Sequence, residues 1–155
     1  MAQLPSNSFD IVVCNMALMM IKRYDDAVKE VARVLKPKGI FVFSITHPCF
    51  WTPGCEWIVT DTKGTGREEK IGWKVDNYHL RPVARWVITG CSQKETYLFY
   101  RTLEDYFRAL RKNGFVVEDL REPLPPKELM EKDPQFEAEL KRSVFLVVKS
   151  VLLET

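Results

Sequence analysis

The strongest constraint on the fold is a strand–helix–strand pattern near the start of the sequence. A short apolar run, Phe9 to Cys14, precedes a segment from Asp25 to Leu35 whose apolar residues recur at helical spacing. Lys36-Pro37-Lys38-Gly39 predicts the end of that helix, and Ile40 to Ile45 is a second apolar run. Because neither run alternates with polar residues, we expect two strands buried on both faces of a parallel sheet. The pattern is that of a βαβ unit and predicts an α/β fold.

The second half of the sequence predicts further elements of the same fold. Thr102, with Asp105 three residues later, predicts a helix that begins with a capping box. Asn113-Gly114 predicts the end of that helix. Three more segments complete the prediction: a strand over 115–120, a polar helix over 127–140 interrupted at Pro134, and a final apolar strand over 143–153.

The middle of the sequence, residues 48–99, does not show this alternation of predicted strands and helices. It contains all four tryptophans, which are Trp51, Trp57, Trp73 and Trp86, together with several glycines and short alternating stretches. We interpret it as an irregular, partly β insertion within a single domain over 1–155. Aromatic residues serve equally well in a lid over a substrate and in a small satellite core, so both roles remain open.

Charge and hydropathy exclude several classes of protein. The 23 basic and 21 acidic residues are mixed along the 155 residues and give a net charge of +2, so neither a nucleic-acid surface nor a polybasic membrane patch is indicated. The longest uninterrupted apolar run, Met16 to Ile21, is much shorter than the roughly 20 residues that cross a bilayer. The first residues lack the pattern of a signal peptide. We therefore expect a soluble, cytoplasmic domain.

Two polar residues follow the predicted parallel strands, where open α/β sheets bind their ligands. Asn15 follows the first strand and offers both a hydrogen-bond donor and an acceptor, although asparagine also caps turns. His47 follows the second strand and titrates in the range useful to a general base, although a structural, hydrogen-bonded histidine is the stronger alternative. Arg101 lies just before the capping box. It could bind a carboxylate or phosphate, although a solvated arginine is the more common outcome.

Short catalytic and metal-binding motifs are absent. The sequence has no GxGxxG, GxxxxGK[ST], HExxH or GxSxG pattern. His47, Cys49 and Cys55 form a weak cluster without the paired spacing and fourth ligand of a zinc site, so we predict no metal.

Residues 4–45 nevertheless resemble a known family. Three segments are similar to the second half of class I S-adenosylmethionine-dependent methyltransferases of the type 11 kind. They are Leu4-Pro5, Ser8-Phe9-Asp10-Ile11-Val12-Val13-Cys14-Asn15, and Ala27 through Lys36-Pro37-Lys38-Gly39. Lys38 replaces the first of two glycines in that pattern. The resemblance continues loosely through Arg101-Thr102-Leu103, Asn113-Gly114-Phe115 and Phe145 to Lys149.

The resemblance implies a Rossmann-like sheet with strand order 3-2-1-4-5-7-6 and an antiparallel last strand, of which this chain supplies strands 4-5-7-6. It also implies S-adenosylmethionine as cofactor, with Asn15, Met16, Ala17 and Leu18 beside its methionine and sulfonium end. His47 and Tyr100 are the residues we expect to orient or deprotonate the methyl acceptor, for which a small molecule is favoured.

The glycine-rich cofactor loop of the family lies in its first βα units, roughly 90 residues that have no counterpart here. The chain is therefore expected to be a fragment that is inactive alone. Its strand Phe9–Cys14 becomes a sheet edge, which predicts self-association or pairing with a separate amino-terminal half.

Two alternatives remain. One is a non-catalytic, methyltransferase-like interaction module that pairs with another chain through the same strand. The other is an unrelated doubly wound ligand-binding domain, against which the similarity of residues 4–45 argues.

Overall fold

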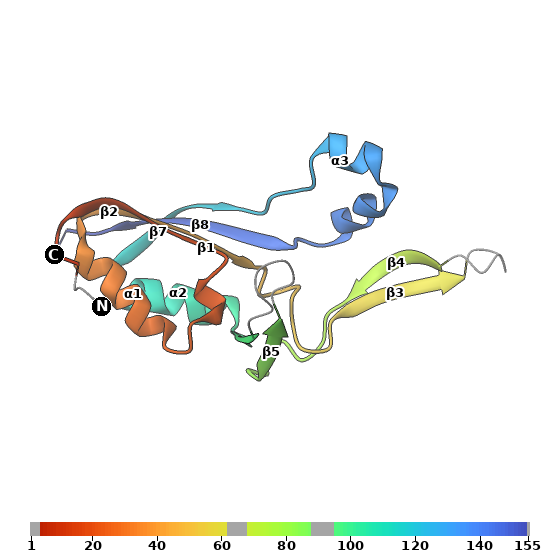
Figure 1. The fold of residues 1–155 in the computed structure, drawn as a ribbon, viewed down its shortest axis with the longest axis horizontal. Coiled ribbons are helices and arrows are strands. Elements are labelled where there is room, and N and C mark those ends of the chain that lie inside the picture. The colour runs from red at the N-terminus through yellow and green to blue at the C-terminus, as the bar shows by residue number, and fades with distance from the viewer. Residues whose placement is uncertain (1–3, 62–67, 88–94, 155) are drawn as a thin grey trace.

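A four-stranded mixed sheet forms the main part of the computed structural model, which describes residues 4–61, 68–87 and 95–154 (Figure 1). The strand order is β1-β2-β8-β7. β1 and β2 are parallel, and β8 runs antiparallel to both β2 and β7. The predicted order 4-5-7-6, with an antiparallel last strand, is confirmed. The strands span Phe9–Asn15 (β1), Leu35–Thr46 (β2), Phe115–Arg121 (β7) and Phe145–Leu152 (β8).

Two helices cover one face of this sheet (Figure 1). α1, Tyr24–Val34, connects β1 to β2, and α2, Leu103–Lys112, precedes β7. Since side chains alternate along a strand, every second residue of β2 points toward these helices. Those residues are Phe41, Phe43 and Ile45, which are buried together with Leu110, Phe115 and Val148. This layer is the hydrophobic core.

The opposite face of the sheet is open in the described part of the chain. No described helix lies over its central strands (Figure 1). Ile11 and Val13 of β1 remain 56% and 66% exposed, and β1 has no neighbour on its outer side among the described strands. Their partners across the parallel ladder are Ile40 and Val42. The structure therefore has an apolar edge strand beside an uncovered apolar face, which is a surface prone to pairing.

The insertion contains two separate two-stranded sheets. β3, Glu56–Asp61, pairs with β4, Glu68–Lys74, and β5, Val83–Val87, pairs with β6, Glu95–Phe99. The hairpin of β3 and β4 extends away from the main sheet (Figure 1).

Polar contacts attach the insertion to the beginning of α2. Arg81 donates to both carboxylate oxygens of Asp105 at 2.8 and 3.1 Å, and the Tyr78 hydroxyl accepts the Leu103 N–H at 3.1 Å. The predicted capping box is present, because Thr102 and Asp105 each accept the other's backbone N–H. The residues that begin α2 therefore also anchor the insertion to the rest of the domain.

One boundary differs from the sequence prediction, and one predicted interruption is found. β2 begins at Leu35 rather than at residue 40, because Leu35 pairs with Phe9 across a bulge and Lys38 adopts a left-handed φ of 64°. The predicted polar helix is divided into α3, Lys127–Lys132, and a 3₁₀ segment η2, Pro134–Lys141. Asp133 ends one and accepts the Gln135 N–H to begin the other, so the interruption at the proline is confirmed. None of the described helices has the length and apolar content needed to cross a membrane.

Candidate functional site

The carboxyl ends of the parallel strands β1 and β2 are joined by a small polar network. The Ser44 hydroxyl donates to Oδ1 of Asn15 at 2.5 Å and accepts the Met16 N–H at 3.0 Å. The carbonyl of Ser44 accepts the same N–H at 3.0 Å. Asn15 therefore does not cap the following turn. Its amide nitrogen has no hydrogen-bond partner among the described residues and lies at the exposed end of the strand.

The backbone turns sharply after Asn15. Met16 has a φ of 50°, a left-handed conformation that is uncommon for a bulky side chain and that clusters at functional sites. The chain then enters a short 3₁₀ helix, η1, Leu18–Met20. Met16 and Ala17 are half-buried, whereas the Leu18 side chain is 2% exposed and packs in the core. A ligand at this turn can meet Asn15, Met16 and Ala17 directly, and Leu18 only through its backbone.

Arg101 stabilises the loop that follows this turn. Its guanidinium donates to the carbonyl of Ile21 at 2.6 Å and to that of Lys22 at 3.2 Å, and it lies 4.0 Å from the centre of the Tyr24 ring. Neither interpretation of Arg101 from the sequence describes these contacts, because the half-buried guanidinium is engaged with backbone carbonyls and the Tyr24 ring. It satisfies the carbonyls at the end of η1 and so fixes the loop that carries Asn15.

His47 lies at the end of β2 with both ring nitrogens engaged. Nε2 lies 2.9 Å from Oε1 of Glu122, and Nδ1 accepts the Cys49 N–H at 3.1 Å. The side chain is buried, and its ring lies 4.8 Å from that of Phe50. Burial lowers the pKa of His47, and the carboxylate of Glu122 opposes this only in part. These contacts are those of a structural histidine, which was the stronger alternative. In this conformation Nε2 is not open to a substrate.

Tyr100 lies near the same sheet edge but does not hydrogen-bond to His47. It is half-buried and lines a small cavity of about 10 Å³ with Thr46 and Pro48, the two neighbours of His47. Burial and the nearby Cys55 thiol raise the pKa of the Tyr100 hydroxyl. The hydroxyl is therefore protonated at neutral pH and is suited to donate a hydrogen bond rather than to remove a proton.

No group of three or more histidine, cysteine, aspartate or glutamate residues that could bind a metal occurs within the described ranges. Cys14, Cys49 and Cys55 are free thiols.

Sequence reasoning missed two residues of this site. Ser44 is a polar residue inside the apolar run of β2, and that interruption was a usable signal. Glu122 gave no such signal, because its pairing with His47 depends on a sheet order that places distant segments together.

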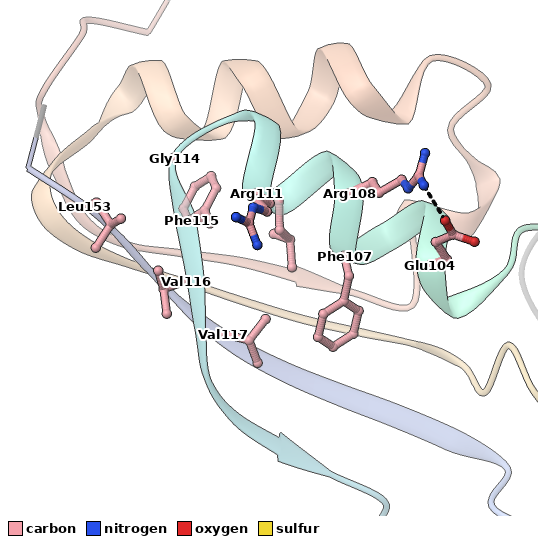
Figure 2. A pocket seen from close by; sticks show the side chains of 10 residues that line it. Glu104, Phe107, Arg108, Arg111, Gly114, Phe115, Val116, Val117 and Leu153 are labelled. Carbon is pink, nitrogen blue, oxygen red and sulfur yellow. Dashed lines mark ion pairs between the residues drawn. The ribbon is translucent and has the colours of Figure 1, made fainter.

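A larger apolar cavity lies at the opposite edge of the sheet. It has a volume of about 680 Å³ between α2 and β7 (Figure 2). Its charged residues include Arg108 and Glu104, which pair at 2.7 Å on the helix surface. It is remote from Asn15 and carries no cluster of reactive groups, so we do not assign the chemistry to it.

Comparisons with known proteins show what the sequence and the fold are similar to. The family model described as "Methyltransferase domain" matches residues 1–43. No curated protein matches the sequence.

Two solved structures are similar over nearly the whole chain. One is a proposed S-adenosylmethionine-dependent methyltransferase from Listeria monocytogenes, 28% identical, with a TM-score of 0.79 over 97% of this chain. The other is an S-adenosylmethionine-dependent methyltransferase from Mesorhizobium loti, 27% identical, with a TM-score of 0.75 over 96% of this chain. The chain spans 64% of the length of each of these proteins. The matched sequence makes residues 1–43 similar to a methyltransferase domain, and the structural likeness makes the whole chain similar to part of S-adenosylmethionine-dependent methyltransferases.

Proposed function

We propose that this chain forms the carboxyl-terminal, acceptor-binding part of an S-adenosylmethionine-dependent methyltransferase. The observation that carries the proposal is the strained turn at Met16. It follows the edge strand of a parallel pair, in a sheet whose order matches that of the family. In open α/β sheets, the carboxyl ends of the strands are where cofactors bind.

The residues at this turn fit one end of the cofactor. Asn15 offers an amide held by Ser44, and Met16 and Ala17 offer an apolar surface, a combination suited to the polar amino-acid end and the adjoining sulfonium of S-adenosylmethionine. Leu18 contributes through its backbone. The cofactor supplies an activated methyl group, and the protein's task is to hold the acceptor in line with it.

Tyr100 and His47 have different roles in this proposal. Tyr100 donates a hydrogen bond that orients the acceptor, since a tyrosine hydroxyl is protonated at neutral pH and burial raises its pKa further. His47 positions the end of β2 through Glu122 and Cys49, and it reaches the acceptor only if its bond to Glu122 opens. Unchanged turnover in the His47→Ala variant of an active assembly would remove His47 from the chemistry. Loss of the acidic limb of the pH–rate profile in that variant would instead identify His47 as a general base.

We further propose that the chain does not bind the cofactor alone. The support is the open apolar face beside β1, with Ile11 and Val13 exposed. A segment that pairs with this edge and covers this face would bring the glycine-rich loop to the turn at Met16. The segment that covers this face belongs either to a separate amino-terminal half or to a second copy of the chain, which would cover the face less completely.

The test is calorimetric titration with S-adenosylhomocysteine of two proteins. One is the 155-residue chain. The other is a fusion in which the part of the L. monocytogenes protein that this chain does not cover, which the family resemblance places at the amino terminus, precedes residue 4. We expect no binding to the chain and micromolar binding to the fusion. A folded fusion that does not bind would contradict the proposal.

The second candidate is a non-catalytic module that pairs with another chain through β1. The same exposed edge favours it. It predicts a stable complex through β1 with no affinity for S-adenosylhomocysteine in any assembly, so the titration distinguishes the two functions.

A further inference from the structure

A buried arginine lies within a cluster of tryptophans, away from the turn at Met16. The guanidinium carbon of Arg142 is 3.8 Å from the centre of the Trp73 ring, 5.1 Å from that of Trp57 and 5.7 Å from that of Trp51. The side chain is only 7% exposed. Cation–π attraction is strongest when the cation is removed from water, so these rings stabilise the buried charge.

The polar atoms of this arginine are not satisfied. Nη2 lies 2.8 Å from Oε2 of Glu139, but the geometry is not that of a hydrogen bond. Nε and Nη1 of Arg142 and Oε2 of Glu139 are buried without a hydrogen-bond partner among the described residues. Buried polar groups are nearly always hydrogen-bonded, so this pair has unused capacity to bind something else.

Arg142 and Glu139 also line a cavity of about 360 Å³. Among the described lining residues, these two alone are charged. The rest of the lining is apolar and includes Pro123, Leu124, Leu129, Phe136, Val144 and Phe145. An apolar cavity with a few polar groups at one place is the usual form of a small-molecule site.

The cavity adjoins the carboxyl end of β2, the strand whose Ser44 contacts the turn at Met16. The carbonyl of Val144 accepts the His47 N–H at 2.9 Å, and Phe145 pairs with Thr46 across the ladder. Phe145, which lines the cavity, lies on β8, and only β2 separates β8 from β1. Since neighbouring strands are about 4.8 Å apart, the cavity begins roughly 10 Å from β1, the strand that carries Asn15. One small molecule can span that distance.

From this arrangement we propose that the cavity binds an apolar carboxylic acid with its carboxylate on Arg142. Resting on the proposed function, this assigns the cavity to the end of the methyl acceptor remote from the methylated atom. Guanidinium groups bind carboxylates through two parallel hydrogen bonds, and the unused Nε makes such a pair available. The apolar lining binds the body of the molecule.

Binding requires a small movement of η2. Nε and Nη1 are covered in this conformation, and η2 carries both Glu139 and Phe136. Because 3₁₀ segments have weaker hydrogen-bond geometry than α-helices, η2 can shift at low cost. The incoming carboxylate then replaces that of Glu139 beside Arg142.

The experiment compares two probes that differ only in charge. 4-Phenylbutyrate and 4-phenylbutan-1-ol are titrated calorimetrically into the 155-residue chain. We expect the acid to bind at least tenfold more tightly than the alcohol. Equal affinities, or no binding of either probe, would overturn the proposal.

Variants separate recognition of the carboxylate from loss of structure. We expect Arg142→Met to abolish the preference for the acid, Arg142→Lys to reduce it, and Glu139→Gln to increase affinity for the acid by removing the competing carboxylate. Arg108→Met changes the net charge equally at an exposed site and should leave the preference intact. A preference that survives Arg142→Met in a folded protein, or an acid affinity lowered by Glu139→Gln, would refute the assignment. S-adenosylhomocysteine plays no part in this titration, so its outcome is independent of the test of methyl transfer.

Discussion

Ser44 donates a 2.5 Å hydrogen bond to the side-chain carbonyl of Asn15, and so connects the last residue of β1 to its neighbour on β2. The same hydroxyl accepts the N–H of Met16, the residue in the left-handed conformation. One small polar side chain thus fixes the direction of the amide and the turn after it. This relationship gives the proposed cofactor site its geometry before any ligand is present.

Replacing Ser44 by alanine should weaken cofactor binding without unfolding the protein. The substitution removes the hydrogen bond that fixes the orientation of the Asn15 amide. We expect the free energy of binding S-adenosylhomocysteine to the fusion protein to weaken by about 1–2 kcal/mol, which corresponds to a roughly 5- to 30-fold higher Kd. Ser8→Ala is the matched control, since within the described part of the chain its hydroxyl bonds to the carbonyl of Ser6, before β1, and to no other group. Equal effects of the two substitutions would contradict this role of Ser44.

Arg101 should be among the largest single contributors to stability outside the apolar core. Arg101→Met removes the hydrogen bonds to the carbonyls of Leu18, Ile21 and Lys22 and the stacking on Tyr24, and we expect it to lower the free energy of unfolding by about 2–3 kcal/mol. Urea unfolding measures the change. Arg108→Met, on the exposed face of α2, should change it by less than about 0.5 kcal/mol. Comparable small effects of both variants would show that Arg101 does not hold the loop.

His47 should make stability depend on pH. Its pKa in the folded protein is lowered by burial, with partial opposition from Glu122, whereas in the unfolded chain it is about 6.5. Below that value the unfolded state binds the proton more readily, so stability is fully present above about pH 7 and decreases as the pH falls toward the folded pKa.

Urea unfolding at pH 7.5 and 5.5 tests this assignment. The wild-type chain should lose stability at the lower pH, and His47→Gln should lose less. His79→Gln, at the other histidine of the sequence, which is exposed, should behave as the wild type. An unchanged pH dependence in His47→Gln would show that His47 is not the responsible group.

A charge on the outer face of β1 should prevent association. Val13 is 66% exposed, so Val13→Lys should leave the stability of the monomer nearly unchanged while it abolishes self-association measured by sedimentation at high concentration. Leu80→Lys places the same charge on an exposed residue of the insertion and should have no effect. A wild-type chain that stays monomeric at every concentration would contradict self-association through β1.

Local signals in the sequence predicted most of the secondary structure. The apolar runs gave β1, β2, β7 and β8, and Thr102 with Asp105 gave the start of α2. The strand order came from the resemblance of residues 4–45 to a family, since neighbouring strands here are distant in the sequence. Local pattern determines which elements form; which elements meet depends on the whole fold.

The site residues show the same division. Asn15 and His47 were found because each follows a strand. The contact of Arg101 with Ile21 spans 80 residues, so no local pattern indicated it. The three tryptophans around Arg142 come from separate parts of the insertion, and only their aromatic character was visible beforehand.

The measurement that tests the central claim most directly is a nuclear magnetic resonance titration of the fusion protein with S-adenosylhomocysteine. Amide resonances report which residues meet the ligand. We predict that, within the 155 residues of this chain, the largest shifts occur from Asn15 to Leu18, with smaller ones at Ser44. Saturable binding that leaves the amides of Asn15 to Leu18 unmoved would show that the carboxyl end of β1 is not the cofactor site.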